Sequence, residues 1–424
     1  MVSPLGDSRE EFWAALCSGT SGITAQTVLP AEALPVKVAG EARRFSGKID
    51  DFGPLEKETK KAIRKGLKVM CRECQMGIAA AQLALADAGF EAGLFDPQRI
   101  GVTFGSDYMI TVPEEFVEGI QGCLDEQGEF EFSRWATDGM PKMSPLWLLK
   151  YLPNMPASHL AIYNNLCGPS NSITLREASS NAAVGEAYHT VLRGHAEAIV
   201  AGAAGTRLHP LKMVHAVQQE ELAQGNGDPS AASRPFDRDR SGMVLGEGAG
   251  AVLLESLESA EARGATIYAE VLGEATSSSV APGLVARCDR AMANAMRAAL
   301  RGAGLEPGEV GHVHAHGLST RAGDVEEARA IQEVFGERAE PVPVVAGKSY
   351  FGNLGAGSGA VELIASLLAL HHGQLFPVLN YESPDPECPV AAVTESGGDP
   401  GRCFVNLNVT PQGQAAAVVI GRMG

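Results

Sequence analysis

Cysteine thiols are the side chains in this sequence best suited to nucleophilic attack or to binding a soft metal ion. Among the eight cysteines only Cys71 and Cys74 form a C-x-x-C pair, and no second pair follows. We therefore interpret this pair as two cysteines one turn apart on a helix rather than as a zinc site. The other cysteines are scattered along 424 residues and do not suggest a disulfide framework. No metal ion and no other cofactor is expected.

Four segments each contain glycine, and three of them also contain charged residues or histidine. The longest is residues 234–250, which read RPFDRDRSGMVLGEGAG. The others are residues 168–170 (GPS), 315–320 (AHGLST) and 348–353 (KSYFGN). Together they resemble the signatures of the β-ketoacyl-acyl-carrier-protein synthases of the thiolase superfamily. The resemblance runs over nearly the whole chain, from the S-P-L-G at residues 3–6 to the last predicted strand.

The resemblance implies a condensing reaction with three physical requirements. A thiolate at a helix N-terminus takes an acyl group from a carrier thioester, two histidines assist decarboxylation of a malonyl unit, and backbone N–H groups stabilise an oxyanion. The family's cysteine lies seven residues beyond its G-P-S, and the same count leads here to Glu177. A carboxylate could form only a mixed anhydride, which is too labile to hold a growing chain. We expect Glu177 to be structural or pseudo-active, stabilised by the helix dipole by about 0.3–1 kcal/mol.

Other residues near these segments are weaker candidates for chemistry. Cys167 lies ten residues before Glu177 and ahead of the strand, so we expect a small buried residue and not a substitute nucleophile. His312 and His314 alternate along the strand that precedes His316, where ordinary packing is the expectation.

The resemblance assigns further site positions. His316 matches the family's first catalytic histidine, whereas the second histidine position holds Asn353. Because an amide can donate a hydrogen bond to a thioester oxygen, we expect His316 and Asn353 to form a polarising pair without a nucleophile. Lys348 and Glu362 match a buried lysine and glutamate of the family, so an ion pair that orders the site is expected.

The C-terminal loop also departs from the family pattern. The family has G-F-G-G-T-N, whose backbone supplies part of the oxyanion hole, and the aligned residues 409–414 read VTPQGQ. Pro411 removes a backbone donor and adds rigidity. With Glu177 and Asn353 this makes three changes in one site, which argues against an ordinary condensing enzyme.

The elements that must position these residues follow one pattern twice: an apolar strand, a turn of small residues and an amphipathic helix. Residues 172–175 lead to a helix with one apolar face, ended by Gly194, and residues 198–201 then form a buried strand. Residues 342–346 lead through a glycine-rich turn to a second such helix, ended by Gly373. Strands that alternate with helices predict an α/β fold with mostly parallel sheets and helices on their faces.

The resemblance makes this expectation more specific. It implies the thiolase fold, with two related α/β halves, the active site between them and a tight dimer. We place the halves at residues 1–256 and 257–424. Because the family normally has a strand of the type R-V-V-I-T-G before its S-P-L-G, either that first strand is missing here or the start is misassigned.

Charge and composition exclude several classes of function. The formal net charge of −17 makes the chain a poor candidate for binding nucleic acid or an anionic membrane surface. No apolar run is long enough to span a bilayer and no secretory signal is visible, so a cytoplasmic location is the default expectation. An acidic carrier protein would need a local basic patch, which composition cannot show.

These observations lead to one expected function and two alternatives. We expect a ketosynthase homologue of fatty-acid or polyketide synthesis that acts as a non-condensing, chain-length-factor-like subunit. Its expected partners are an acyl carrier protein and a cysteine-bearing ketosynthase in a heterodimer, with a homodimer as the alternative. The first alternative function is a malonyl-carrier decarboxylase, against which an ionised Glu177 would weigh by repelling a malonyl carboxylate. The second is an ordinary 3-oxoacyl-acyl-carrier-protein synthase, which requires the register at Glu177 to be wrong.

Overall fold

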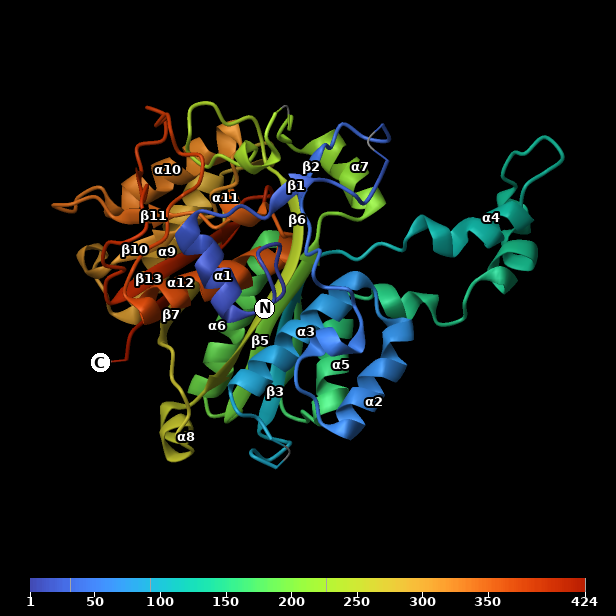
Figure 1. The fold of residues 1–424 in the computed structure, drawn as a ribbon, viewed down its shortest axis with the longest axis horizontal. Coiled ribbons are helices and arrows are strands. Elements are labelled where there is room, and N and C mark those ends of the chain that lie inside the picture. Colours follow the sequence, from blue (N-terminus) through green and yellow to red (C-terminus); the bar gives the residue numbers. More distant parts are fainter. Residues whose placement is uncertain (31, 92, 226, 424) are drawn as a thin grey trace.

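Two six-stranded sheets form the centre of the computed structural model, which describes residues 1–30, 32–91, 93–225 and 227–423 (Figure 1). The first sheet has the order β1-β2-β6-β5-β3-β4, formed by Ile23–Ala25, Val38–Gly40, Leu245–Glu255, Ala198–Thr206, Ile100–Ser106 and Ser170–Thr174. The second has the order β12-β11-β10-β13-β14-β7, formed by Ala391–Ala392, Pro343–Val345, His312–His314, Cys403–Val409, Gln414–Gly421 and Glu270–Ser278.

The two sheets repeat one topology. In the first, β3 lies parallel to β4 and β5, and β5 pairs antiparallel with β6. In the second, β10 lies parallel to β11 and β13, and β13 pairs antiparallel with β14. Helix α6 (Ser179–Leu192) joins β4 to β5 as α12 (Ser358–His372) joins β11 to β13. The predicted α/β architecture with two related halves is therefore confirmed.

Helices α6 and α12 pack against each other between the two sheets. Helices α3 (Arg72–Asp87) and α5 (Met155–Asn164) cover the outer face of the first sheet, and α9 (Cys288–Ala303) and α10 (Arg321–Phe335) lie beyond the second. The result is five alternating layers of helix and sheet (Figure 1). Because α6 and α12 share the central layer, the segments that lead into them meet between the halves.

The two central helices end where the sequence predicts. Gly194 and Gly373 both adopt left-handed backbone conformations, with φ values of 70°. Such a conformation carries no steric penalty in glycine and lets the backbone close the last helical turn. Strand β5 is buried over all nine residues, which explains why it reads as a continuous run of small and apolar side chains.

The first residues of the chain lie against β6. Val2 exchanges two backbone hydrogen bonds with Ala249 in an isolated antiparallel bridge, and α1 (Arg9–Ser18) follows. On the corresponding side of the second sheet, β7 pairs antiparallel with β14 over most of its length. Beside β6 the described residues therefore place the short strand β2 and this single bridge, whereas the second half has a full strand beside β14.

Residues 109–152, called the arm below, extend far from the body of the molecule (Figure 1). The arm contains α4 (Val117–Gly122) and several short 3₁₀ or π turns, and it begins and ends beside α3 and α5. Several of its large apolar side chains are exposed: Val117, Ile120, Phe130, Phe132, Met140, Leu146, Leu148 and Leu149. Among the described residues no helix is both long and apolar enough to cross a membrane.

Candidate functional site

Glu177 lies between the two halves, at the start of the central layer. The 3₁₀ turn η8 (Arg176–Ala178) carries it and continues directly into α6. The hydroxyl of Ser179 accepts a hydrogen bond from the backbone N–H of Leu175 and donates one to the carbonyl of Ser106. A side-chain carbon at Gly105 would lie 2.8 Å from the backbone carbonyl of Ser179, so only glycine permits this close packing.

Arg176, the residue before Glu177, has a left-handed backbone conformation with a φ of 47°. For a long side chain this conformation costs on the order of 1 kcal/mol or more, so surrounding contacts must hold it. Its guanidinium lies 3.4 Å from Glu177 Oε2 and donates to Glu220 Oε1 at 2.9 Å. These two carboxylates are thus the contacts that keep the strained turn in place.

Two arginines bind the Glu177 carboxylate in the protein interior. Glu177 is only 1% exposed and Arg207 only 2%. Arg207 donates to Glu177 Oε1 at 3.2 Å through one nitrogen and to Glu220 through another. We call Arg176, Glu177, Arg207 and Glu220 the arginine–glutamate cluster. It contains two cations and two anions, so the buried charges neutralise one another.

The charge state of Glu177 follows from this cluster. Burial alone would raise the pKa of its carboxyl, but Arg176 and Arg207, together with a hydrogen bond from Asn353, lower that pKa to about 2. Glu177 is therefore ionised throughout the physiological range. Two arginines from different segments therefore hold this carboxylate, in addition to the helix dipole that the sequence analysis expected.

Asn353 follows α11 (Lys348–Phe351) in the loop that leads to α12. Its Oδ1 accepts hydrogen bonds from the N–H of Gly355 at 3.0 Å and the hydroxyl of Ser358 at 3.2 Å, which fixes the orientation of the amide. The NH₂ group then points at Glu177 and donates to Oε1 at 3.0 Å. The NH₂ group that the sequence suggested as a donor to a thioester oxygen therefore donates to the Glu177 carboxylate.

His316 and the Lys348–Glu362 pair lie together on the side of the site formed by the second half. Lys348 and Glu362 are fully buried and form an ion pair of 2.5 Å, as expected. Lys348 Nζ also donates to the carbonyl of His316 at 2.7 Å and lies 3.3 Å from His316 Nδ1. Burial and the nearby Lys348 lower the pKa of His316 well below its usual value, so the imidazole is neutral.

Two residues that the sequence analysis did not single out complete this side of the site. Asn408 on β13 donates to Glu362 Oε2 at 2.7 Å and lies 3.4 Å from His316 Nδ1. Glu327 on α10 accepts hydrogen bonds from the backbone N–H groups of His316 and Gly317 at 2.6 and 2.7 Å. Asn408 and Lys348 thus contact one ring nitrogen of His316, while Glu327 fixes the loop that carries it.

The weaker candidates lie apart from Glu177 and Asn353. His312 and His314 are buried and share Ser366 as a hydrogen-bond partner, in agreement with a packing role. Cys167 is exposed, with its thiol beside Asn165, so the expected burial is wrong. The reason is that Cys167 enters β4, which is the edge strand of the first sheet.

The loop at residues 409–414 is a tight turn between β13 and β14. The N–H of Thr410 donates to the carbonyl of Gln414, and the N–H of Gly413 donates to that of Thr410, while Pro411 and Gln412 point to solvent. A proline at this place removes no hydrogen bond of the hairpin.

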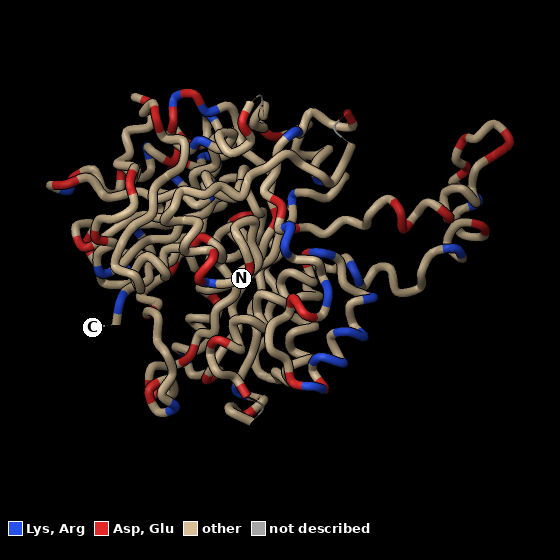
Figure 2. Tube along the Cα trace, in the orientation of Figure 1, with Lys and Arg blue, Asp and Glu red and all other residues tan. Residues whose placement is uncertain are grey.

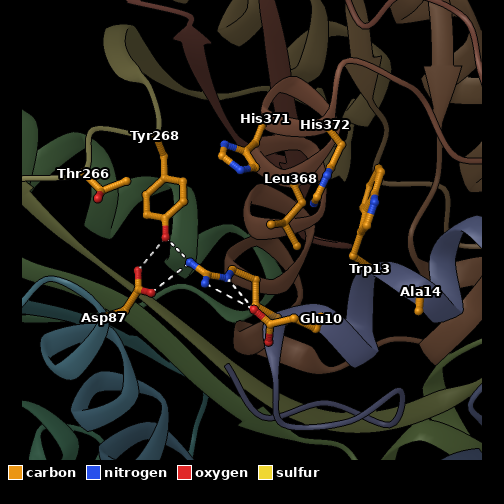
Figure 3. Close-up of a pocket in the computed structure, with 10 residues that line it drawn as sticks. Glu10, Trp13, Ala14, Asp87, Thr266, Tyr268, Leu368, His371 and His372 are labelled. Atoms are coloured by element: carbon orange, nitrogen blue, oxygen red, sulfur yellow. Dashed lines mark hydrogen bonds and ion pairs between the residues drawn. The ribbon is translucent and has the colours of Figure 1, made fainter.

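A cavity of about 550 Å³ lies elsewhere, between α1 and the end of α12 (Figure 3). The ring of Trp13 stacks on His372, and Arg9 contacts Asp87 and the ring of Tyr268. None of the residues of the arginine–glutamate cluster lines this cavity. Within the described residues no group of three or more His, Cys, Asp or Glu side chains is arranged to hold a metal ion.

Sequence reasoning found Glu177, His316, Lys348, Asn353 and Glu362 but missed the arginines that determine the state of Glu177. Arg207 follows the end of β5 and Glu220 follows α7 (Pro210–Gln219), so neither belongs to a local motif with Glu177. Glu327 could have been found, because it lies one helical turn beyond Asp324, which follows the AHGLST segment.

Comparison with known proteins gives consistent matches over the chain. Residues 1–260 match the family model "Beta-ketoacyl synthase, N-terminal domain" and residues 268–382 match "Beta-ketoacyl synthase, C-terminal domain". The 3-oxoacyl-[acyl-carrier-protein] synthase 2 of Synechocystis sp. is 34% identical over 388 residues, which cover 91% of this chain and 87% of that protein. The protein of the same name from Staphylococcus aureus is 32% identical over 423 residues, covering 99% and 98%.

A similar solved structure is that of the ishigamide ketosynthase/chain length factor. It superposes with a TM-score of 0.83 at 27% sequence identity, and the match covers 100% of this chain and 97% of the other. The repeated topology described above is therefore the thiolase-type arrangement of ketosynthases.

Proposed function

This chain belongs to the β-ketoacyl synthase family, and we propose that it is a non-condensing, chain-length-factor-like subunit that pairs with a cysteine-bearing ketosynthase. The observation that carries the proposal is the ionised Glu177, which occupies the nucleophile position and is bound by Arg176, Arg207 and Asn353. A carboxylate neutralised by two guanidinium groups is a weak nucleophile. The side-chain amide of Asn353, which could polarise a thioester, already donates its hydrogen bond to Glu177.

The surfaces of the chain support a partner of similar fold. Strand β4 is an edge strand whose residues are exposed or half-buried, and Ile162 on the neighbouring α5 is 71% exposed. In an isolated subunit, an uncovered edge strand and an arm with many exposed apolar side chains would promote aggregation, so both surfaces favour a bound partner. A solved structure similar to this chain is named for both a ketosynthase and a chain length factor, which supports the proposed pairing.

Decarboxylation of malonyl groups is the second candidate, and it is favoured by the neutral, buried His316 held by Lys348 and Asn408. The expected repulsion between Glu177 and a malonyl carboxylate is weaker than the sequence suggested, because Arg176 and Arg207 neutralise Glu177. Against this function stands Asn353, whose NH₂ group already donates to Glu177.

Intact-protein mass spectrometry tests the proposal. The chain is incubated with acyl- and malonyl-loaded carrier protein, alone and together with a co-purified cysteine-bearing homologue. We expect no adduct on this chain and acylation on the partner only. Conversion of malonyl- to acetyl-carrier by this chain alone would favour the decarboxylase. A stable acyl adduct on this chain would contradict the proposal and indicate an ordinary condensing enzyme.

A basic helix face supports an acyl carrier protein as the second partner. Helix α2 (Lys57–Gly66) and the turn after it present five exposed basic residues on this acidic chain (Figure 2): Lys57, Lys61, Arg64, Lys65 and Lys68. Only Glu56 and Glu58 carry negative charge in the same stretch. This is the local basic patch that an acidic carrier requires, and we propose α2 as its docking surface.

Reversing three of these charges is expected to weaken carrier binding. The variant Lys61→Glu/Arg64→Glu/Lys65→Glu should bind the carrier at least about tenfold more weakly at low salt, and the difference should shrink as salt screens the charges. Binding is measured by surface plasmon resonance at two salt concentrations. The control reverses Arg238, Arg301 and Arg321, which are exposed elsewhere. Equal loss in both triple variants would mean that only net charge matters and that α2 is not the docking surface.

A further inference from the structure

Cys71 and Cys74 form a dithiol at the start of a helix. Cys71 is the N-cap residue of α3 and Cys74 lies in its first turn, and their Sγ atoms are 3.6 Å apart. A disulfide requires a separation of about 2.0 Å, which a modest rotation of both side chains can supply. We propose that Cys71 and Cys74 form a reversible disulfide by exchange with a low-molecular-weight disulfide such as that of glutathione.

The two thiols differ in a way that suits them to successive steps. Cys71 is partly exposed, whereas Cys74 is fully buried. The hydrogen bond with Cys71 and burial raise the pKa of Cys74 well above its usual value. Cys71 is therefore the thiol that meets an external disulfide, and Cys74 is the one that resolves the intermediate.

The exchange balances in two steps. Cys71 loses its proton to solvent and its thiolate attacks the external disulfide, which forms a mixed disulfide on Cys71 and releases one thiolate. Cys74 then loses its proton to solvent and attacks Cys71 Sγ, which closes the protein disulfide and releases the second thiolate. The protein dithiol is oxidised by two electrons, and the external disulfide is reduced to two thiols.

The surrounding contacts keep the helix start in place during this change. Between the cysteines, Arg72 forms an ion pair with Glu247, and Glu73 binds Lys212 and the backbone N–H of Thr206. These side chains anchor the first turn of α3 to the first sheet and to α7. Closing the disulfide therefore moves the sulfur atoms and leaves the helix intact.

The sulfur atoms also contact both ends of the arm. Cys71 Sγ lies 3.8 Å from Met109 Sδ. The backbone N–H of Cys71 donates to the carbonyl of Lys150 at 3.3 Å. Cys74 Sγ lies 3.8 Å from that same carbonyl. Because bond formation requires both sulfur atoms to move, their contacts with Met109 and Lys150 must change. Oxidation is thereby expected to loosen the attachment of the arm to the body.

Thiol counting tests the disulfide. The full chain with Cys167→Ser, which removes the exposed thiol, is equilibrated in glutathione buffers from reducing to oxidising, quenched in acid and alkylated with a maleimide under denaturing conditions. Intact mass should show two fewer alkylated thiols after oxidation, mapped to the Cys71–Cys74 peptide. Cys71→Ser or Cys74→Ser should abolish this loss, and the control Cys17→Ser should retain it. Full alkylation of both cysteines in oxidised glutathione alone would overturn the proposal.

Limited proteolysis tests the effect on the arm. Trypsin should cleave at Arg134 or Lys142 about threefold faster or more in the oxidised protein than in the reduced one, because a looser arm opens more often. The Cys74→Ser variant should show equal rates under both conditions. Equal rates for a protein whose disulfide has formed would overturn the coupling to the arm while leaving the disulfide established.

Discussion

Replacing Arg207 with alanine is expected to lower the free energy of unfolding by about 3–5 kcal/mol. Arg207 is buried and contacts both carboxylates of the arginine–glutamate cluster. Its removal leaves Glu177 and Glu220 to share Arg176, with one uncompensated negative charge in the interior. Urea unfolding followed by circular dichroism measures the change, and the exposed Arg301→Ala, at the end of α9, is the control and should differ from the parent by less than about 0.5 kcal/mol.

A second variant separates the lost charge from the lost volume. In Arg207→Met/Glu177→Leu both partners become apolar side chains of similar size, so no charge of this pair is left unpaired. Replacing a whole buried pair in this way is often neutral or stabilising. The double variant should therefore be more stable than Arg207→Ala. If Arg207→Ala loses less than about 1 kcal/mol, the cluster is not a determinant of stability and the account of Glu177 given above is wrong.

The second large effect is a pH dependence carried by Glu177. Its pKa is lowered from 4.5 to about 2 in the folded protein, which corresponds to about 3 kcal/mol of stabilisation. Because the folded pKa is depressed, this stabilisation is fully present above pH 4.5 and is lost as the pH falls toward 2. The parent protein should exceed Glu177→Gln in stability by a constant amount between pH 7 and 5, and this gap should narrow between pH 4.5 and 2.5.

Comparing the parent protein with Glu177→Gln isolates the contribution of the Glu177 carboxyl to the pH dependence of stability. Other buried carboxyls shift in the opposite direction, since burial raises the pKa of Glu327 to about 8 and that of Asp324 to about 7. Both groups are present in both proteins, so their contributions cancel in the difference. Urea unfolding at pH 7, 5, 4 and 3 gives the gap, and Glu126→Gln on the arm is the control, for which the gap should stay near zero. A gap for Glu177→Gln that is unchanged at pH 3 would contradict the lowered pKa.

The sequence alone determined the fold and most of the candidate site residues. Two stretches with the same periodicity predicted two related α/β halves, because the pattern of strand, turn and helix is local along the chain. Short motifs located His316, Asn353 and the Lys348–Glu362 pair, and counting from G-P-S placed Glu177 at the nucleophile position. These residues lie within a few positions of glycine-rich turns that the sequence marks clearly.

Helix α2 marks an intermediate case. Its lysines and Arg64 are visible in the sequence, yet the net charge of −17 gave no indication of a local basic patch. They form a single patch only because a helix brings positions three and four apart onto one face. The burial of Cys167 was predicted wrongly for a related reason, since an edge strand cannot be told from an interior one by its residues alone.

Only the tertiary structure decided what Glu177 can do. Arg207 follows the end of β5 and reaches Glu177 because the first sheet brings the end of β5 beside the start of α6, and Glu220, which follows α7, binds Arg176 and Arg207. The orientation of Asn353 depends on Gly355 and Ser358, and its hydrogen bond to Glu177 crosses from one half to the other. A carboxylate in a sequence can be protonated, ionised, free or paired. Its state here is determined by its neighbour Arg176, by Arg207, which reaches it when the first half folds, and by Asn353, which reaches it only when the two halves pack together.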